Sequence, residues 1–88
     1  MKLEKKVSIK NRLGLHARPA ALFVQIANKY SCSIIVKKGE LEVNGKSIMG
    51  ILMLEAGKGS KILIKADGDD AEKALVELEH LLLNNMEF

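Results

Sequence analysis

Aromatic side chains are scarce in this sequence, which has no tryptophan, one tyrosine and two phenylalanines among its 88 residues. Proteins that bind single-stranded nucleic acid use aromatic side chains as stacking platforms, so this chain lacks their principal contact. Its basic charge is also modest, because 14 Lys and Arg residues stand against 11 Asp and Glu residues. The net charge of +3 is not gathered into a cluster of the kind that nucleic-acid binders carry. We therefore expect no nucleic-acid partner.

Cysteine and long apolar segments are also lacking. Cys32 is the only cysteine, so no disulfide framework exists within the chain, and we expect this residue to be a small half-buried hydrophobe. The first ten residues, MKLEKKVSIK, lack the apolar region of a signal peptide. No apolar run approaches the length that crosses a bilayer. These absences predict a cytoplasmic protein without a membrane partner.

Ligand patterns for metals and nucleotides are absent too. His16, His80 and Cys32 do not fall at close zinc-ligand spacing with the carboxylates. The stretch GKS at 45–47 is similar to the end of a phosphate-binding loop, but Glu40 stands five residues before Gly45, where that loop requires glycine. We therefore expect no metal and no cofactor.

The length of the chain is sufficient for one domain, which we expect to span residues 1–88. A chain of this size buries roughly 60–65% of its unfolded surface, which supports a two-layer core but no deep catalytic cleft. Any chemistry should therefore take place at the surface, with a partner protein or a small anion.

Alternating apolar residues predict four strands, over 5–10, over two segments within 32–43 that meet at a turn at Lys38–Gly39, and over 61–66. The residues expected to face inward are Val7, Ile9, Ile34, Val36, Leu41, Val43, Ile62 and Ile64.

Helical spacing predicts three helices. The first runs from about 17 to 29, with Pro19 in its first turn, where a missing N–H is tolerated. Ser47 fits the N-cap of a short helix that ends near Leu54. The last helix begins with Asp69 and Glu72 as a capping box and has its buried stripe at Ala71, Leu75, Leu78 and Leu82. The order β-α-β-β-α-β-α predicts an α+β fold in which a four-stranded sheet carries its helices on one face.

The segment GLHARPA, residues 14–20, holds the strongest candidate for chemistry. His16 stands just before the first helix, beside the unpaired backbone N–H groups of residues 17 and 18. These donors and the helix dipole form a ready anion site, and the dipole favours a neutral, nucleophilic imidazole. Arg18 can add a fork of N–H donors to a phosphate. The pattern fits a phosphorylated histidine, although a solvent-facing histidine that merely begins a helix remains the alternative.

A longer stretch, NRLGLHARPAALFVQIANKY, closely resembles the active-site segment of the HPr family, the histidine-containing phosphocarriers of the bacterial phosphoenolpyruvate-dependent phosphotransferase system. The resemblance covers essentially the whole chain. NGKSIMGILML is similar to the regulatory-serine segment of the family, and ADGDDAEKAL continues the likeness in register. The combination of GLHARPA with KSIMG at this separation is highly specific.

The resemblance implies that His16 accepts a phosphoryl group from enzyme I on Nδ1 and passes it to a sugar-specific enzyme IIA. Arg18 and the backbone N–H of Ala17 would stabilise that group. Ser47 matches the residue that an ATP-dependent HPr kinase/phosphorylase modifies in many members. The family fold is an open-faced sandwich with an antiparallel sheet of order 1-4-2-3.

Two further expectations concern partners. A transient partner needs an apolar patch with a polar rim, and the candidates around the first two helices are Ala17, Ala20, Ala21, Ile48, Met49 and Leu52. Core packing is the equal alternative for Met49. The stretch LMLEAGKG resembles the nitrogen-related branch of the family, because sugar-type members usually carry glycine in place of Glu55. The alternative function is therefore a mainly regulatory member, which acts on a transcription or metabolic regulator through Ser47.

Overall fold

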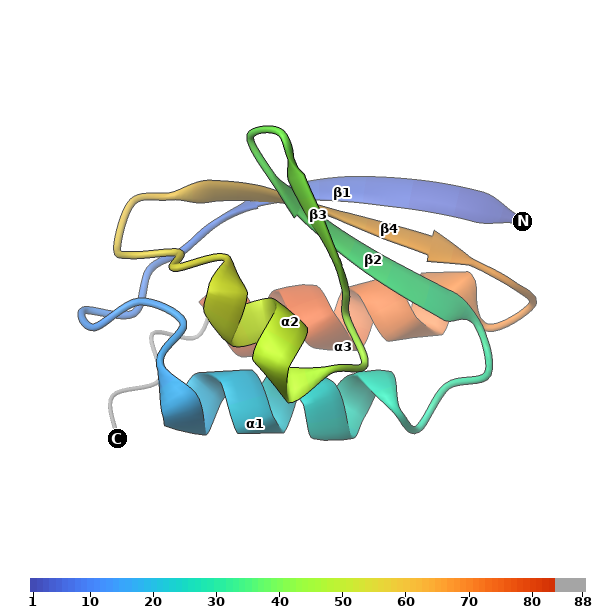
Figure 1. The fold of residues 1–88 in the computed structure, drawn as a ribbon. Coiled ribbons are helices and arrows are strands. Elements are labelled where there is room, and N and C mark those ends of the chain that lie inside the picture. The colour runs from blue at the N-terminus through green and yellow to red at the C-terminus, as the bar shows by residue number, and fades with distance from the viewer. Residues whose placement is uncertain (84–88) are drawn as a thin grey trace.

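The computed structural model describes residues 1–83, and residues 84–88, the end of the domain expected over 1–88, lie outside that part. The elements follow one another in the predicted order (Figure 1): β1 (Lys2–Ser8), α1 (Ala17–Ala27), β2 (Ser33–Lys38), β3 (Leu41–Asn44), α2 (Ile48–Met53), β4 (Lys61–Asp67) and α3 (Ala71–Leu83).

The four strands form one antiparallel sheet of order β1-β4-β2-β3. Its central register places Ile62 opposite Val7 and Ile64 opposite Val36. All three helices lie on the same face of the sheet, as Figure 1 shows. The predicted α+β open-faced sandwich is confirmed.

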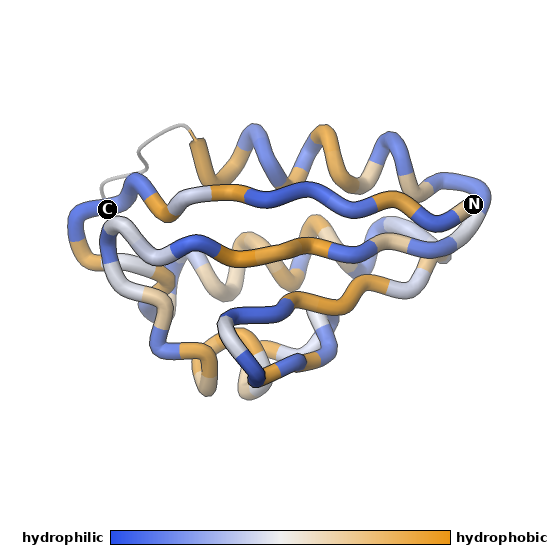
Figure 2. Tube along the Cα trace, turned by 90° about the horizontal axis from the view of Figure 1, so that it is seen from above, coloured by the Kyte–Doolittle hydropathy of each residue, from blue (hydrophilic) through white to orange (hydrophobic). Residues whose placement is uncertain are grey.

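The core lies between the sheet and this helix layer. Phe23 of α1, Ile51 of α2 and Leu78 of α3 are fully buried against the inward residues of the strands. The predicted stripe of α3 is confirmed, since each of its four residues is buried. Figure 2 looks onto the opposite face, which no helix covers.

Three predicted boundaries are wrong. Strand β1 covers Lys2–Ser8 rather than 5–10, because pairing with β4 continues through Lys2 despite the charged sequence there. Ile9 leaves the strand but stays buried, and its N–H donates to the Ser60 carbonyl at 2.8 Å. Helix α1 ends at Ala27 rather than near 29, because the N–H groups of the next turn bond three residues back.

Leu41 is also a correction, since 42% of its side chain is exposed although it was expected to face the core. It pairs with Lys38 near the tip of the β2–β3 hairpin, and this tip rises on the side of the sheet that faces away from the helices (Figure 1). Val43, two residues closer to the body of the sheet, packs partly against the core. The alternation along β3 correctly places Leu41 on the same side as Val43, but none of the described helices covers that end of the strand.

The start of α3 differs from the predicted capping box of Asp69 and Glu72. The helix begins one residue later than that pattern requires, so Asp70 precedes it. The Asp70 carboxylate instead accepts hydrogen bonds from the backbone N–H groups of Ser31 and Cys32, each at 2.9 Å. The bond from Ser31 is the main reason why the pKa of Asp70 lies below its ordinary value. Cys32 itself is fully buried rather than half-buried, and burial raises the pKa of its thiol.

Glu77 of α3 makes a second tie to the same segment. Its carboxylate accepts from Lys29 Nζ at 2.6 Å and from the hydroxyl of Tyr30. The Lys29 bond, followed by the Tyr30 bond, lowers the pKa of Glu77, while the bond to Glu77 raises the pKa of Tyr30.

Among the described residues, no helix is long and apolar enough to cross a membrane.

Candidate functional site

The loop between β1 and α1 turns sharply at Gly14. This residue has a φ of +75°, which side-chain-bearing residues rarely adopt. A Cβ atom at this position would also lie 2.4 Å from the carbonyl oxygen of Ala56 and 2.6 Å from the Cα of Gly57. Glycine is therefore required both by the backbone conformation and by the close approach of the segment that follows α2.

Leu15 then fastens the loop to the same segment. Its N–H donates to the Ala56 carbonyl at 2.8 Å, and its side chain is buried. The backbone immediately before His16 is therefore held between the core and the end of α2. Because the supporting contacts involve backbone atoms, they place His16 accurately without occupying its ring.

His16 is the N-cap of α1, as predicted, with φ −86° and ψ −168°. Its carbonyl accepts the first helical hydrogen bond, from Ala20 N–H at 2.9 Å, but its side chain makes no capping bond. The first-turn N–H groups of Ala17 and Arg18 consequently receive no acceptor from the cap, and Pro19 has no N–H. The helix thus begins with donors that point toward the site and are available to an anion.

The two ring nitrogens of His16 differ in their surroundings. Nε2 is buried and has no hydrogen-bond partner within residues 1–83. The ring as a whole is only partly buried. A group that approaches from solvent therefore does not reach Nε2.

Arg18 is exposed in the first turn of α1, beside this cap. Its guanidinium makes no hydrogen bond or ion pair with the part of the chain that the structure describes. An unengaged guanidinium can turn toward an anion without first breaking an internal ion pair.

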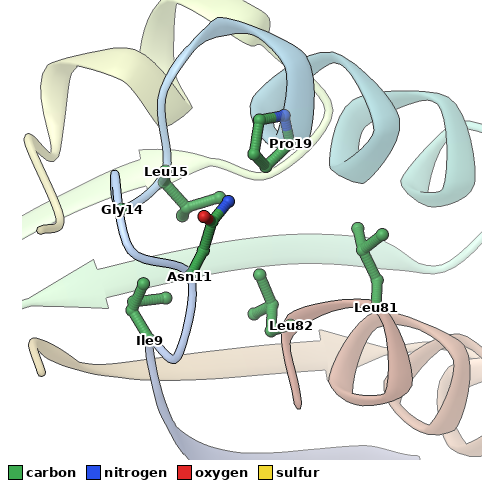
Figure 3. A pocket seen from close by; sticks show the side chains of 7 residues that line it. All are labelled: Ile9, Asn11, Gly14, Leu15, Pro19, Leu81 and Leu82. Carbon is green, nitrogen blue, oxygen red and sulfur yellow. The ribbon is translucent and has the colours of Figure 1, made fainter. Parts of the chain in front are cut away.

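A second unpaired polar group lies in the loop that precedes the histidine. Asn11 is buried, and its Nδ2 has no partner among residues 1–83. Figure 3 shows its side chain beside Leu15 and Pro19, at a cavity of about 10 Å³ that Leu81 and Leu82 of α3 also line. A cavity of that size is near the smallest that holds one water molecule.

Ser47 caps α2, as the sequence predicted. Its backbone is extended, with φ −113° and ψ 121°, and its hydroxyl oxygen accepts from the N–H of Gly50 at 3.2 Å. The preceding residue, Lys46, contacts the far end of α1, where its carbonyl accepts from Asn28 Nδ2 at 3.3 Å. Ser47 and His16 thus lie at opposite ends of α1, separated by roughly 18 Å of helix.

The apolar candidates divide into exposed and buried residues. Ile48 and Met49 are exposed, with 40% and 65% of their surfaces accessible, and Leu52 is half-buried. Ala17 is exposed and Ala21 is half-buried. Ala20 is a correction, because it is completely buried in the contact of α1 with the core and offers no surface to a partner.

Two exposed apolar residues near this surface escaped the sequence analysis. Met53 is 59% exposed and follows Met49 by four residues, so the helical period itself could have placed it on the same face. Leu13 is 61% exposed in the loop before His16, and no periodic signal marks it. Side by side, α1 and α2 carry most of this surface (Figure 1).

Glu55 follows α2 and has a positive φ of 48°. Lys38 Nζ donates to the carbonyl oxygens of Leu54 and Glu55 at 3.1 Å each, which holds this turn in place. The next residue, Ala56, contacts the loop that carries His16. Glu55 therefore lies next to the segment that contacts the loop of the candidate site.

This fold and site define a class of small carrier domains, in which a histidine at a helix start is presented at the surface without an enclosing cleft. The family model described as the HPr component phosphorylation site of the phosphotransferase system matches residues 3–84. The chain belongs to the HPr family of phosphocarrier proteins.

Individual relatives agree with this assignment. The chain is 42% identical over 83 residues to the phosphocarrier protein HPr of Treponema pallidum, with 94% of each chain covered. It is 46% identical over 76 residues to the HPr-like protein Crh of Halalkalibacterium halodurans, covering 86% of this chain and 90% of the relative. The structure of an HPr from Thermoanaerobacter tengcongensis superposes with a TM-score of 0.92 at 46% identity, covering 98% of this chain and 99% of that one.

Proposed function

We propose that this protein carries a phosphoryl group on His16, which it receives from enzyme I and delivers to an enzyme IIA of the phosphotransferase system. The observation that supports this most directly is the position of His16, which caps α1 with its backbone while its side chain makes no capping bond. A carrier histidine needs such a position because two different partners must reach the same nitrogen from solvent.

The reaction uses Nδ1 as the nucleophile. Its lone pair attacks the phosphorus of phosphorylated enzyme I, a P–N bond to His16 forms, and the bond from phosphorus to the donor breaks with the electron pair leaving on the donor. For Nδ1 to hold that lone pair, the ring proton must reside on Nε2, the nitrogen that is buried. In the second step, a nucleophile on enzyme IIA attacks the same phosphorus and the pair returns to Nδ1.

Groups at the start of α1 would stabilise the phosphoryl oxygens. The N–H groups of Ala17 and Arg18 and the positive end of the helix dipole favour a negative charge at this point. The Arg18 guanidinium can add two parallel hydrogen bonds. No buried acid or base is required, because the phosphoryl group passes between partners that each supply their own reacting atom.

The decisive experiment compares the two histidines. We expect His16→Ala to abolish labelling by phosphoenolpyruvate and enzyme I, and His80→Ala to retain it. His80 is exposed on α3, so it controls for the removal of an imidazole from the surface. Neither change should alter the free energy of unfolding by more than about 0.5 kcal/mol, as is usual for surface positions. Retained labelling of the folded His16→Ala variant would exclude the carrier mechanism.

We propose further that Ser47 is a regulatory site for an HPr kinase/phosphorylase. A phosphate there would add about −1.5 to −2 charges at the positive end of α2, where it does not disturb the helix. Since Ser47 and His16 lie at opposite ends of α1, the phosphate would act on the partner rather than on the imidazole. Its neighbours Ile48 and Met49 belong to the exposed apolar surface that enzyme I and enzyme IIA would contact.

Ser47→Asp should therefore slow phosphorylation of His16 by enzyme I roughly tenfold, because a rim charge next to a docking surface mainly affects association. Ser47→Ala should keep the wild-type rate but lower the unfolding free energy by about 1 kcal/mol, since it removes the helix cap. Ser33→Asp adds the same charge on the open face of the sheet and serves as the control. Equal rates for Ser47→Asp and Ser47→Ala would leave Ser47 as a helix cap alone.

A mainly regulatory member is the second candidate, supported by the likeness to the HPr-like protein Crh. Such a protein would act on a transcription or metabolic regulator after modification of Ser47. Two results together would distinguish this regulatory function from the carrier function. The kinase would modify Ser47 efficiently, and His16 would fail to transfer its phosphoryl group to any enzyme IIA.

A further inference from the structure

The open face of the sheet carries a group of three lysines around one apolar side chain. Leu63 of β4 has Lys6 of β1 directly opposite on one side and Lys37 of β2 on the other. Lys61 precedes Leu63 by two residues on β4, so it projects from the same face. By this register and alternation, the three lysines lie around Leu63 on the face of the sheet opposite the helices.

These residues line a shallow hollow of about 260 Å³, together with Gly39 and Ile62. Leu63 is only partly exposed, and it forms the centre of the group. Lysine side chains lie along apolar surface through their methylene groups and keep the ammonium in water. The lysine hollow, as we call this group of Lys6, Lys37 and Lys61 around Leu63, thus combines an apolar centre with a basic margin.

Two other positive groups near this face are paired. Lys65 Nζ lies 2.7 Å from the Glu42 carboxylate, and the N-terminal ammonium lies 3.8 Å from that of Asp67. None of the three hollow lysines makes a hydrogen bond or a short ion pair within residues 1–83, although Glu42 of β3 lies directly opposite Lys37 and its pKa is lowered by the bond from Lys65 and in part by the charge of Lys37. The hollow itself is lined by three positive and no negative side chains, a charge that a negatively charged occupant would complement.

We propose that the lysine hollow is a docking surface for an acidic segment of a partner protein. Carboxylates of the segment would meet the three lysines, and an apolar side chain between them would contact Leu63. Strands lie about 4.8 Å apart, so the backbones of Lys6 and Lys37 are separated by about 10 Å. Positive charges at that spacing fit several carboxylates along a chain better than one compact anion.

A single phosphate group is a poorer fit for two reasons. The hollow contains no arginine that could hold it in a bidentate fork. Strand β4 pairs on both sides, so its backbone N–H groups are engaged in the sheet and cannot form an anion cradle. The side chains available are flexible point charges, which suit a carboxylate-rich surface.

This surface lies on the opposite face of the sheet from the helix layer that holds His16 (Figure 1). An acidic partner on the lysine hollow would therefore leave the loop before His16 and the helices α1 and α2 accessible. One protein could accordingly remain bound while phosphoryl groups enter and leave His16.

The probe for this surface is a short fluorescein-labelled peptide that repeats Glu-Glu-Leu, with a peptide that repeats Gln-Gln-Leu as the uncharged control. We expect only the acidic peptide to bind, and to shift the amide NMR signals of Leu63 and its neighbours on β1 and β2. Combined Lys6→Glu, Lys37→Glu and Lys61→Glu should weaken binding roughly tenfold or more, since each exposed ion pair contributes a small, salt-sensitive amount.

The matched variant replaces Lys10, Lys58 and Lys73 by Glu, which changes the net charge equally at exposed positions outside the hollow. It should bind the acidic peptide much more tightly than the hollow variant. Phosphorylation of His16 by enzyme I should be unchanged in the hollow variant, and this readout also establishes that it is folded. Equal weakening in both triple variants, or NMR shifts confined to α1 and α2, would overturn the proposal.

Discussion

The two ends of helix α1 are built in opposite ways. At its start, the reactive end comprises Asn11, Gly14, His16 and Arg18, and there Asn11 Nδ2 and His16 Nε2 are buried without a hydrogen-bond partner among residues 1–83. At its finish, the anchored end comprises residues 28–32 and the groups that bind them, and there polar atoms are extensively paired. Such groups cost free energy where no water or ligand satisfies them, and both lie beside the candidate site.

At the anchored end, polar side chains of the same helix and its neighbours make several hydrogen bonds. Asn28 Nδ2 donates to the carbonyls of Val24 and Lys46, and Lys46 Nζ donates to the Tyr30 carbonyl at 2.6 Å. These bonds connect α1 to the start of α2, while Asp70 adds the connection to α3. The stability that these bonds contribute offsets the free-energy cost of the buried polar groups at the reactive end.

The reactive end is nevertheless held in place, mainly by close backbone packing against Ala56 and Gly57. Gly14→Ala tests that claim, because its Cβ would overlap the Ala56 carbonyl oxygen and its φ is positive. We expect a loss of about 3 kcal/mol in unfolding free energy, from the strain and the overlap together. Denaturant titration measures this loss, and the rate of His16 phosphorylation should fall in the same variant.

Gly39→Ala is the control for Gly14→Ala. Gly39 has a similar φ of +60°, but nothing lies within 4 Å of the Cβ that it would gain. It should cost only the conformational strain, about 1 kcal/mol. Equal losses in the two variants would show that the contact with Ala56 contributes nothing to the position of the loop.

Arg18→Lys has a smaller expected effect and bears on the chemistry alone. The ammonium keeps the charge but cannot form two parallel hydrogen bonds to a phosphate, so we expect transfer to slow by about tenfold. Since the Arg18 side chain is exposed, the melting temperature should stay at its wild-type value. Stopped-flow measurement with phosphorylated enzyme I gives the rate, and an unchanged rate would place the guanidinium outside the site.

The anchored end should respond to acid. The pKa values of Asp70 and Glu77 are lowered in the folded state, so their contribution to stability is fully present above the unfolded values of about 4. That contribution is lost as the pH falls through the lower, folded values. We expect the melting temperature to be nearly constant from neutral pH to about pH 5 and to fall below about pH 4.

Asp70→Asn should melt below the wild type at neutral pH, and the gap should narrow as the solution becomes acidic. Asp69→Asn is the matched control, because Asp69 is exposed beside it and makes none of the bonds to residues 31 and 32. A gap that stays constant from neutral pH to pH 3 would mean that the Asp70 charge does not hold this end together. Phosphorylation of His16 should be insensitive to both changes at neutral pH.

Local sequence predicted the features that depend on neighbouring residues. The caps at His16 and Ser47 were readable because a helix start needs only an extended residue, free N–H groups and a suitable side chain within one turn. The alternation that buries Ile62 and Ile64 was readable for the same reason, since it requires only the period of a strand. The predicted capping box at Asp69 is wrong because the carboxylate of Asp70, the next residue, instead accepts a hydrogen bond from Ser31 in the loop after α1.

The sequence by itself thus determined the order of elements, the strand and helix faces, and the histidine that begins α1. Tertiary structure alone decided that Ala20 is buried, that Gly14 meets the Ala56 carbonyl, and that Ser47 lies a helix length from His16. It also brought three lysines from three strands around Leu63. The physical reason is that burial, close approach and charge pairing depend on which distant segments pack together, and a periodicity read along the chain does not contain that information.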